Sequence, residues 1–385
     1  MSATSSRDIL RELIGFDTTS RNSNLELMEW VCTYLRKLGV EPLLVHNAEG
    51  TKANLYATLG PADRSGVMLS GHTDVVPVDG QNWSNDPWTL TERDDRLYGR
   101  GTCDMKGFIA ICLAYAPQFI ERATSMPIHF AFSYDEEVGC VGVQTLIEKM
   151  KSMPIRPAMC IVGEPTDMQV VTGHKGKRSY RVAVTGTEAH SSLAPQAVNA
   201  VEYGARLVTY LRSMADRFSA DGPFDDMYDV THTTVHTGIM GGGTALNIVP
   251  QACEIEFEFR NIGSHDGDEI ISEIRRYTDE ILVPAMRAVA PETGIEITEV
   301  TSAPGLDTGA DEDVVAFVKS LAERNDHAKV AFATEAGLFQ DRLDIPTVIC
   351  GPGSINQAHK PDEYVSLEQL ALCERFMDRL VEKLS

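Results

Sequence analysis

The stretch that decides the fold is Gly66-Val-Met-Leu-Ser-Gly-His72-Thr-Asp74, an apolar run that leads directly into a histidine and a carboxylate. Two later stretches repeat this arrangement: Pro127-Ile-His-Phe-Ala-Phe-Ser133 precedes Asp135-Glu136-Glu137, and Ala158-Met-Cys-Ile-Val-Gly163 precedes Glu164. Short apolar runs are typical of buried strands, and ligands of an open α/β sheet gather beyond the carboxyl ends of its strands. The sequence therefore predicts an α/β sheet whose strand ends bring His72 and these acids together.

Helices and strands alternate on both sides of this stretch. Apolar positions at helical spacing predict helices over 7–15 and 25–39, and Asn54-Leu-Tyr-Ala-Thr-Leu59 is typical of a strand. A further strand of the buried type, Ile345-Pro-Thr-Val-Ile-Cys-Gly351, runs into the loop that carries His359. We expect His359 to lie near the other strand ends.

The middle of the chain follows a different pattern. Residues 178–185 and 253–260 alternate between apolar and polar, and residues 196–217 have helical spacing. Strict alternation favours an antiparallel sheet with one exposed face. We predict an inserted domain over residues 177–302, with residues 1–176 and 303–385 forming the two parts of a first domain.

Length, charge and cysteine usage limit the class of protein. A chain of 385 residues favours two domains. Its formal net charge of -22 disfavours binding to nucleic acid or to an anionic membrane, because both require basic groups. The eight cysteines are scattered, and neither a signal peptide nor a membrane span is evident. We expect a soluble protein of the cytoplasm with reduced thiols.

Each polar cluster has a structural alternative when it is taken alone. His72 and Asp74 share one side of an extended strand, so the imidazole could bind zinc or be a hydrogen-bonded core histidine. Asp104 lies in the glycine-rich stretch Gly99–Gly107 and could bridge two ions or be a solvated turn acid. Residues 135–137 could form a plain acidic loop, and Glu164 and His359 could each be structural.

Taken together, the set favours a metal site. Two histidines, one aspartate and three glutamates supply the mixed nitrogen and oxygen donors that suit zinc. Cys103 is the competing ligand, and we expect it to be a small packing residue beside Asp104. A nucleotide-binding α/β protein is disfavoured, because no GxGxxG or Walker sequence occurs at a strand-to-helix junction.

Five motifs, taken in order, resemble the M20 family of metallopeptidases and deacylases. They are Ser70-Gly-His-Thr-Asp-Val-Val-Pro77, Gly99-Arg-Gly-Thr-Cys-Asp-Met-Lys-Gly107, Asp135-Glu-Glu-Val-Gly139, Gly163-Glu-Pro-Thr166 and the late His359. The resemblance runs from the first predicted helix to Pro361.

The resemblance assigns roles to the residues of these motifs. It implies two Zn²⁺ ions, for which Co²⁺ can substitute, with Asp104 bridging them. His72 and Glu164 would complete one site, and Glu137 and His359 the other. Asp74 would orient His72, and Glu136 would be the general base.

The resemblance also implies the architecture. It predicts a zinc-dependent exopeptidase-like α/β catalytic domain that carries an inserted ferredoxin-like α+β lid domain, through which two copies form a homodimer. His190, in Gly186-Thr-Glu-Ala-His-Ser-Ser192, would stabilise the oxyanion in the partner subunit's site. Arg260, Asn247 and the backbone of Gly351 and Gly353 would hold the α-carboxylate of the substrate.

Four segments point to a substrate within the family. Similarity to deacylases of N2-acetyl-L-ornithine is carried by Gly163-Glu-Pro-Thr166, Gly173-His-Lys-Gly176, Thr334-Glu-Ala-Gly-Leu-Phe339 and Gly351-Pro-Gly-Ser-Ile-Asn-Gln-Ala-His359. Enzymes acting on acetylcitrulline, succinyl-diaminopimelate, other N-acyl amino acids or dipeptides share most of these segments and remain alternatives. A non-catalytic relative would be expected to lose ligands or the Glu136 base, and all are present here.

Overall fold

The computed structural model describes residues 4–385, which form two compact units. The first unit contains the chain up to Gly173 together with Leu306–Lys329 and Thr334–Ser385. The second unit contains His174–Gly305 and Val330–Ala333.

A nine-stranded sheet forms the centre of the first unit. The strands lie in the order β1-β2-β6-β3-β7-β15-β8-β13, and β14 pairs with β8. Their bounds are β1 Leu43–His46, β2 Ala53–Leu59, β3 Val67–His72, β6 Ile128–Ser133, β7 Met159–Val162, β8 Val171–His174, β13 Leu306–Asp307, β14 Ala328–Val330 and β15 Thr347–Ile349. A small separate sheet, in the order β16-β5-β4, contains Tyr364–Ser366, Arg96–Tyr98 and Thr91–Arg93.

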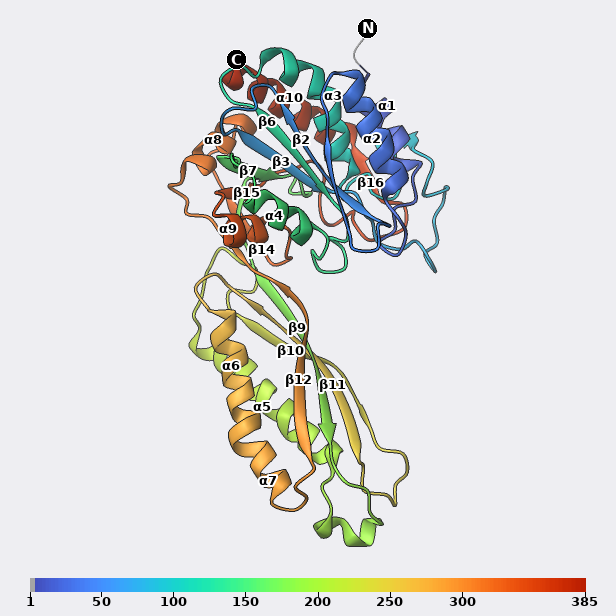
Figure 1. Ribbon diagram of the computed structural model, residues 1–385, viewed down its shortest axis with the longest axis vertical. Coiled ribbons are helices and arrows are strands. Elements are labelled where there is room, and N and C mark those ends of the chain that lie inside the picture. The colour runs from blue at the N-terminus through green and yellow to red at the C-terminus, as the bar shows by residue number, and fades with distance from the viewer. Residues whose placement is uncertain (1–3) are drawn as a thin grey trace. The chain divides into compact units, whose positions relative to one another are not determined.

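Helices cover both faces of the large sheet, with α3 and α10 on one side and α4 and α9 on the other (Figure 1). The helices of this unit are α1 Ser6–Ile14, α2 Leu25–Lys37, α3 Lys106–Arg122, α4 Val143–Lys151, α8 Asp313–Ala322, α9 Ala336–Leu343 and α10 Leu367–Leu384. One apolar core joins α1, α2, α3, α8 and α10 to the central strands. Because helices cover both faces, β3 and β6 are buried at every position rather than at alternate ones.

The direction of four central strands positions the site. Strand β3 runs parallel to β6 and to β7, and β7 runs parallel to β15. Their carboxyl ends therefore lie at one edge of the sheet and their amino ends at the opposite edge. The predicted α/β sheet is confirmed.

The second unit has a four-stranded antiparallel sheet in the order β10-β11-β9-β12. Its elements follow the chain as β9 Gly176–Thr185, η1 Ser191–Gln196, α5 Ala200–Asp221, β10 Thr234–Gly242, β11 Ala252–Asn261, α6 Gly267–Tyr277, η2 Thr278–Leu282, α7 Val283–Arg287 and β12 Gly294–Ala303. The succession β-α-β-β-α-β in this order is the ferredoxin-like arrangement. The inserted α+β fold is thereby confirmed.

The helix expected over residues 196–217 begins and ends later than predicted. Asn199 caps it, because its side chain accepts hydrogen bonds from the amides of Val201 and Glu202. The helix ends at Asp221, and the residue that caps it is Gly222, whose φ of 73° is open to glycine at little cost. None of the helices within residues 4–385 combines the length and apolar character that a membrane span requires.

Candidate metal centre

The carboxyl ends of the parallel strands bring the predicted site residues together. His72 is the last residue of β3, Glu136 and Glu137 follow β6, and Glu164 follows β7. Two further residues reach the same edge, Asp104 from the turn before α3 and His359 from the loop after β15. Residues separated by up to 287 positions in the chain thus share one site.

Asp104 lies at the centre of this cluster and contacts both histidines. Its Oδ1 is 2.9 Å from His72 Nε2, and its Oδ2 is 3.2 Å from His359 Nε2. The other oxygen contacts are 3.5 Å from His72 Nε2 to Glu164 Oε1 and 3.1 Å from His359 Nε2 to Glu137 Oε2. This is the arrangement expected of a carboxylate that bridges two ions.

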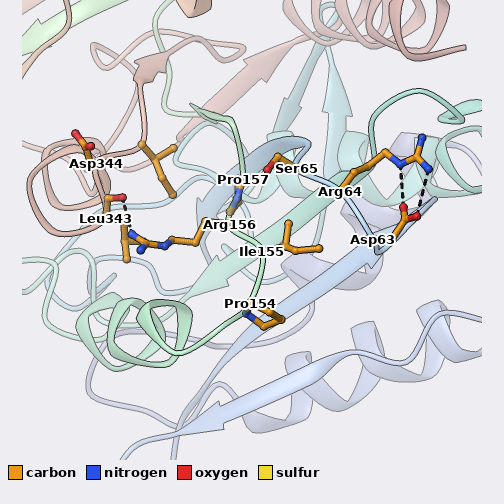
Figure 2. A pocket seen from close by; sticks show the side chains of 10 residues that line it. Asp63, Arg64, Ser65, Pro154, Ile155, Arg156, Pro157, Leu343 and Asp344 are labelled. Carbon is orange, nitrogen blue, oxygen red and sulfur yellow. Dashed lines mark hydrogen bonds and ion pairs between the residues drawn. The ribbon is translucent and has the colours of Figure 1, made fainter.

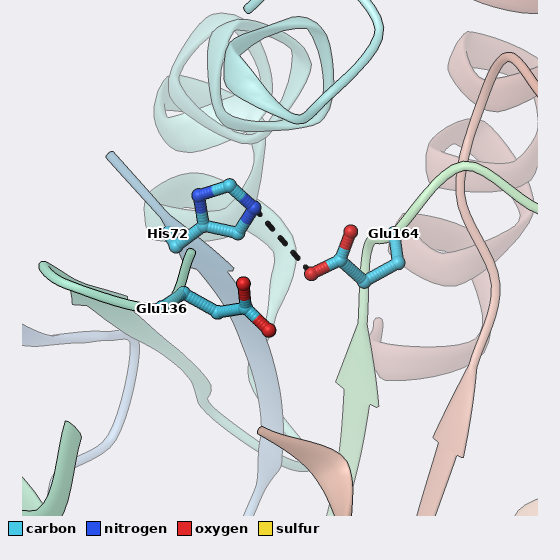
Figure 3. Close-up of side chains that lie close together, drawn as sticks. All are labelled: His72, Glu136 and Glu164. Carbon is cyan, nitrogen blue, oxygen red and sulfur yellow. Dashed lines mark ion pairs between the residues drawn. The ribbon is translucent and has the colours of Figure 1, made fainter. Parts of the chain in front are cut away.

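The donor atoms form two overlapping groups. His72, Asp104 and Glu137 offer ligand atoms within 4.8 Å of one another, and so do His72, Glu136 and Glu164. Figure 3 shows the second group, with the carboxylates of Glu136 and Glu164 both directed towards the imidazole of His72. Glu136 is therefore close enough to the cluster to bind an ion or to exchange a proton beside it.

Asp74 supports the site in two ways. Its backbone carbonyl accepts a hydrogen bond from His72 Nδ1 at 2.9 Å, which leaves Nε2 free to face Asp104 and Glu164. Its carboxylate accepts from the amides of Glu136 at 3.1 Å and Glu137 at 3.3 Å, and from Ser20 Oγ at 2.7 Å. The side chain thus holds the acidic loop, while the main chain orients the imidazole.

Crowding of acids shifts the pKa values in the site. Burial and the charges of Glu137, Glu335 and Asp104 raise the pKa of Glu136 well above its usual range. Burial and Asp104 raise the pKa of Glu137 to about 7. Burial opposes protonation of His72, but Glu164, Asp104 and Asp74 outweigh it and hold the pKa of this imidazole well above its ordinary value.

These residues fit divalent cations. Four carboxylates and two imidazoles face one another, and acids this close keep protons unless a cation neutralises them. Glu137 Oε1 is buried and has no hydrogen-bond partner among the described residues, as expected of an atom meant for an ion. Donors of mixed nitrogen and oxygen type, with no cysteine among them, are consistent with zinc.

The residue predicted to stabilise the oxyanion and two residues predicted to bind the substrate lie in the second unit. His190 is exposed, and its Nδ1 is 2.8 Å from Ser192 Oγ. Asn247 is exposed, and Arg260 Nε donates to Glu258 Oε1 at 3.0 Å.

The two glycines predicted to hold a carboxylate have amides that are already engaged. Gly351 N donates to Thr166 Oγ1 at 3.2 Å, and Gly353 N donates to Gln369 Oε1 at 3.1 Å. A substrate carboxylate would have to displace these partners.

Two buried acids beside the site were missed by sequence reasoning. Glu335 accepts a hydrogen bond from Ser133 Oγ, and burial raises its pKa to about 7. Glu363 contacts the loop that carries Asp104. Glu335 lies in the segment Thr334–Phe339 and Glu363 lies shortly after His359, but an acid in a loop gives no sign of burial in the sequence.

A hollow of about 550 Å³ lies at the other edge of the sheet (Figure 2). Its walls come from the segments before β3, β7 and β15, and they are residues 63–65, 154–157 and 343–345. The Arg64 side chain pairs with Asp63, and Arg156 Nη1 donates to the carbonyl of Leu343 at 3.1 Å. Among the described residues, the groups of side chains that could hold a metal ion lie at the carboxyl ends of the strands and include none of the residues that line this hollow.

The amino-acid sequence is similar to those of proteins named acetylornithine deacetylase. Acetylornithine deacetylase of Proteus mirabilis is 32% identical over 373 residues, which cover 95% of this chain and 92% of that protein. Acetylornithine deacetylase of Pasteurella multocida is 31% identical over 361 residues, covering 93% of this chain and 91% of that protein.

Solved structures share the fold at lower sequence identity. An M20 family metallo-carboxypeptidase from Sulfolobus solfataricus has a TM-score of 0.76 at 18% identity and covers 99% of both chains. Aminopeptidase PepT from Bacillus cereus has a TM-score of 0.73 at 19% identity over the whole of both chains. Residues 68–383 match the model of peptidase family M20/M25/M40, and the chain belongs to that family.

Proposed function

We propose that this protein is a dizinc amidohydrolase that converts N2-acetyl-L-ornithine and water into L-ornithine and acetate. Two observations together support the proposal. The structure has a complete cluster of acids and histidines, and relatives named acetylornithine deacetylase are 31–32% identical over more than nine-tenths of the chain. Cytoplasmic location, a homodimer formed through the inserted domain and a role in arginine biosynthesis belong to the same proposal.

The proposed ligands follow the contacts of Asp104. This carboxylate would bridge the ions, with His72 and Glu164 on one side and Glu137 and His359 on the other. Zinc held by these residues would supply a water molecule of lowered pKa and would polarise an acyl carbonyl. The protein's own contribution is to fix the donors, since Asp74 holds both the His72 tautomer and the acidic loop.

Glu136 is the proposed general base. Its raised pKa suits a group that must both accept and return a proton near neutral pH. It would take a proton from the attacking water as the new carbon–oxygen bond forms. It would then give that proton to the α-nitrogen as the carbon–nitrogen bond breaks, releasing acetate and the amine.

The remaining roles concern the oxyanion and the carboxylate of the substrate. His190 is proposed to donate to the oxyanion, an interaction typically worth about 3–4 kcal/mol. Arg260 and Asn247 are proposed to bind the α-carboxylate, since a guanidinium matches a carboxylate in two hydrogen bonds. We favour them over the backbone of Gly351 and Gly353, whose amides already have partners.

Kinetics on a panel of substrates test the proposal. The zinc-loaded protein is assayed for kcat/KM on N-acetyl-ornithine, N-acetyl-citrulline, N-succinyl-diaminopimelate, N-acetyl-methionine and a dipeptide. We expect a preference for N-acetyl-ornithine of at least about tenfold, or roughly 1.4 kcal/mol. Another preferred substrate would overturn the acetylornithine assignment and keep the hydrolase, whereas no activity on any of them with zinc bound would overturn both.

A further inference from the structure

Glu363 is a fully buried acid that the proposed chemistry does not use. It lies four residues after His359, immediately before β16, and its side chain is 1% exposed. Burying a carboxylate is costly unless its oxygens are paired and hydrogen-bonded. The partners of Glu363 therefore indicate what the residue does.

All of these partners belong to the loop that carries Asp104. Glu363 Oε2 accepts from Arg100 Nη1 at 2.7 Å and from the amide of Gly101 at 3.0 Å. Glu363 Oε1 accepts from the amide of Cys103 at 2.9 Å and from the amide of Asp104 at 3.1 Å. The loop thus wraps around one carboxylate, and the main chain of Asp104 is tied to it directly.

A second set of contacts leads from the same carboxylate to His359. The guanidinium of Arg100, itself 1% exposed, donates through Nη2 to Gln81 Oε1 at 2.6 Å. Gln81 Nε2 in turn donates to the carbonyl of His359 at 3.1 Å. Trp83 Nε1 also donates to Gln81 Oε1, at 3.0 Å.

Together these contacts form a ring that includes Asp104 and His359, two of the residues of the candidate metal centre. The side chains of Asp104 and His359 meet at 3.2 Å, and their main chains are joined on the other side through Glu363, Arg100 and Gln81. The two residues are otherwise 255 positions apart in the sequence. A rigid tie of this kind fixes the spacing of two donors before any ion binds.

We propose that Glu363, Arg100 and Gln81 form a positioning network that sets the distance between Asp104 and His359. The network thereby sets the affinity of the ion shared by Asp104, His359 and Glu137, and leaves the ion beside His72 and Glu164 less affected. The inference rests on the two-ion arrangement of the proposed function. Glu363 acts through Asp104 and is a positioning residue rather than a catalytic one.

The substitution Glu363→Gln tests the network with little change of volume. An amide has one acceptor oxygen in place of two, and its NH₂ group faces either Arg100 or the amides of Cys103 and Asp104. The full-length protein is stripped with a chelator, and binding of Zn²⁺ and Co²⁺ is measured by competition with a chromogenic chelator. We expect one of two dissociation constants to rise about 10–100-fold and the other to change less than about threefold.

A milder variant keeps the test valid if Glu363→Gln does not fold. Gln81 is only half-buried, and Gln81→Ala removes its contacts to the His359 carbonyl and to Arg100 Nη2, while the buried Arg100 guanidinium keeps its ion pair with Glu363. We expect the same single dissociation constant to rise by about 3–10-fold, since the hydrogen bond lost to the His359 carbonyl is worth about 1 kcal/mol. The absorption spectrum of the second Co²⁺ ion to bind should change with it.

A matched control separates this role from general destabilisation. Asp378→Asn weakens the hydrogen bond from Tyr115 Oη, 2.7 Å long, which joins α10 to α3 away from the loop. We expect this variant to lower the melting temperature and leave both metal affinities unchanged. Failure of the parent protein to bind two ions would overturn the proposed function itself. Two ions in the parent, with both dissociation constants unchanged in Glu363→Gln and Gln81→Ala, would overturn the network alone.

Discussion

His72 and His129 are both buried histidines on neighbouring parallel strands, yet they lie in opposite electrostatic surroundings. His72 ends β3 and is 1% exposed, and His129 lies near the start of β6 and is 3% exposed. Carboxylates surround His72 and raise its pKa well above the ordinary value despite burial. His129 Nδ1 contacts Thr58 Oγ1, its ring stacks on Tyr56, and burial lowers its pKa to about 4.

The difference shows how one sheet serves two purposes. At the carboxyl ends the strands stop at polar residues, and the acids gather where ions can neutralise them. At the amino ends, Arg64 pairs with Asp63 at the surface and Arg156 contacts a backbone carbonyl. Function and stability should therefore respond separately to changes at the two ends.

The largest expected effect is the loss of turnover in Glu136→Gln. The substitution removes the proposed base and should lower kcat by roughly 10²–10⁴-fold. Because Glu136 is not among the proposed ligands, metal analysis should still find about two zinc ions per chain. Steady-state kinetics and metal analysis on the same preparation check both halves of the prediction.

The next effect is a loss of metal in His359→Ala. This side chain contacts Asp104 and Glu137, so its removal should lower the zinc content towards one ion per chain and lower activity with it. Metal analysis after dialysis measures the change. Equal loss of zinc in Glu136→Gln and His359→Ala would contradict the division into base and ligand.

Sequence patterns predict the framework of the site better than its surroundings. The five predicted ligands follow apolar runs or lie in glycine-rich stretches, and this pattern can be recognised in the sequence alone. They are His72, Asp104, Glu137, Glu164 and His359. The structure places all five at one edge of the sheet. Their roles as ligands stay a prediction.

The missed residues share a physical reason. Glu335 and Glu363 are acids in loops, and only the folded chain shows that their carboxylates are 1% exposed. Partners of Glu363 lie about 260 positions earlier in the chain, so local spacing carries no trace of them. The helix beginning at Ala200 was misplaced for a simpler reason, because the cap at Asn199 was not recognised.

A smaller effect concerns stability and should appear at the amino end of β6. The unfolded chain protonates His129 near the ordinary pKa of about 6.5, whereas the native imidazole stays neutral down to about 4. The unfolded state therefore binds more protons between these values, and stability falls as the pH drops through this range. The loss from pH 7 to pH 5 should be about 2 kcal/mol from this residue.

His129→Phe should remove that sensitivity while keeping an aromatic ring against Tyr56. Urea unfolding of chelated parent and variant at pH 7 and pH 5 measures the difference. We expect the parent to lose about 2 kcal/mol more than the variant does. An identical pH dependence in the two proteins would show that burial does not lower the pKa of His129 in the native state.

The smallest effect is expected at the hollow of Figure 2. Arg64 pairs with Asp63 where both side chains are at least half exposed, and such pairs contribute little because water screens them. Arg64→Ala should therefore change the free energy of unfolding by less than about 0.5 kcal/mol and kcat/KM by less than about twofold. Arg156→Ala should leave kcat/KM equally unchanged, since its contact is with the Leu343 carbonyl before β15. A tenfold fall in kcat/KM in either variant, with zinc content intact, would mean that the amino ends of the strands contribute to the reaction, and the separation of the two ends would fail.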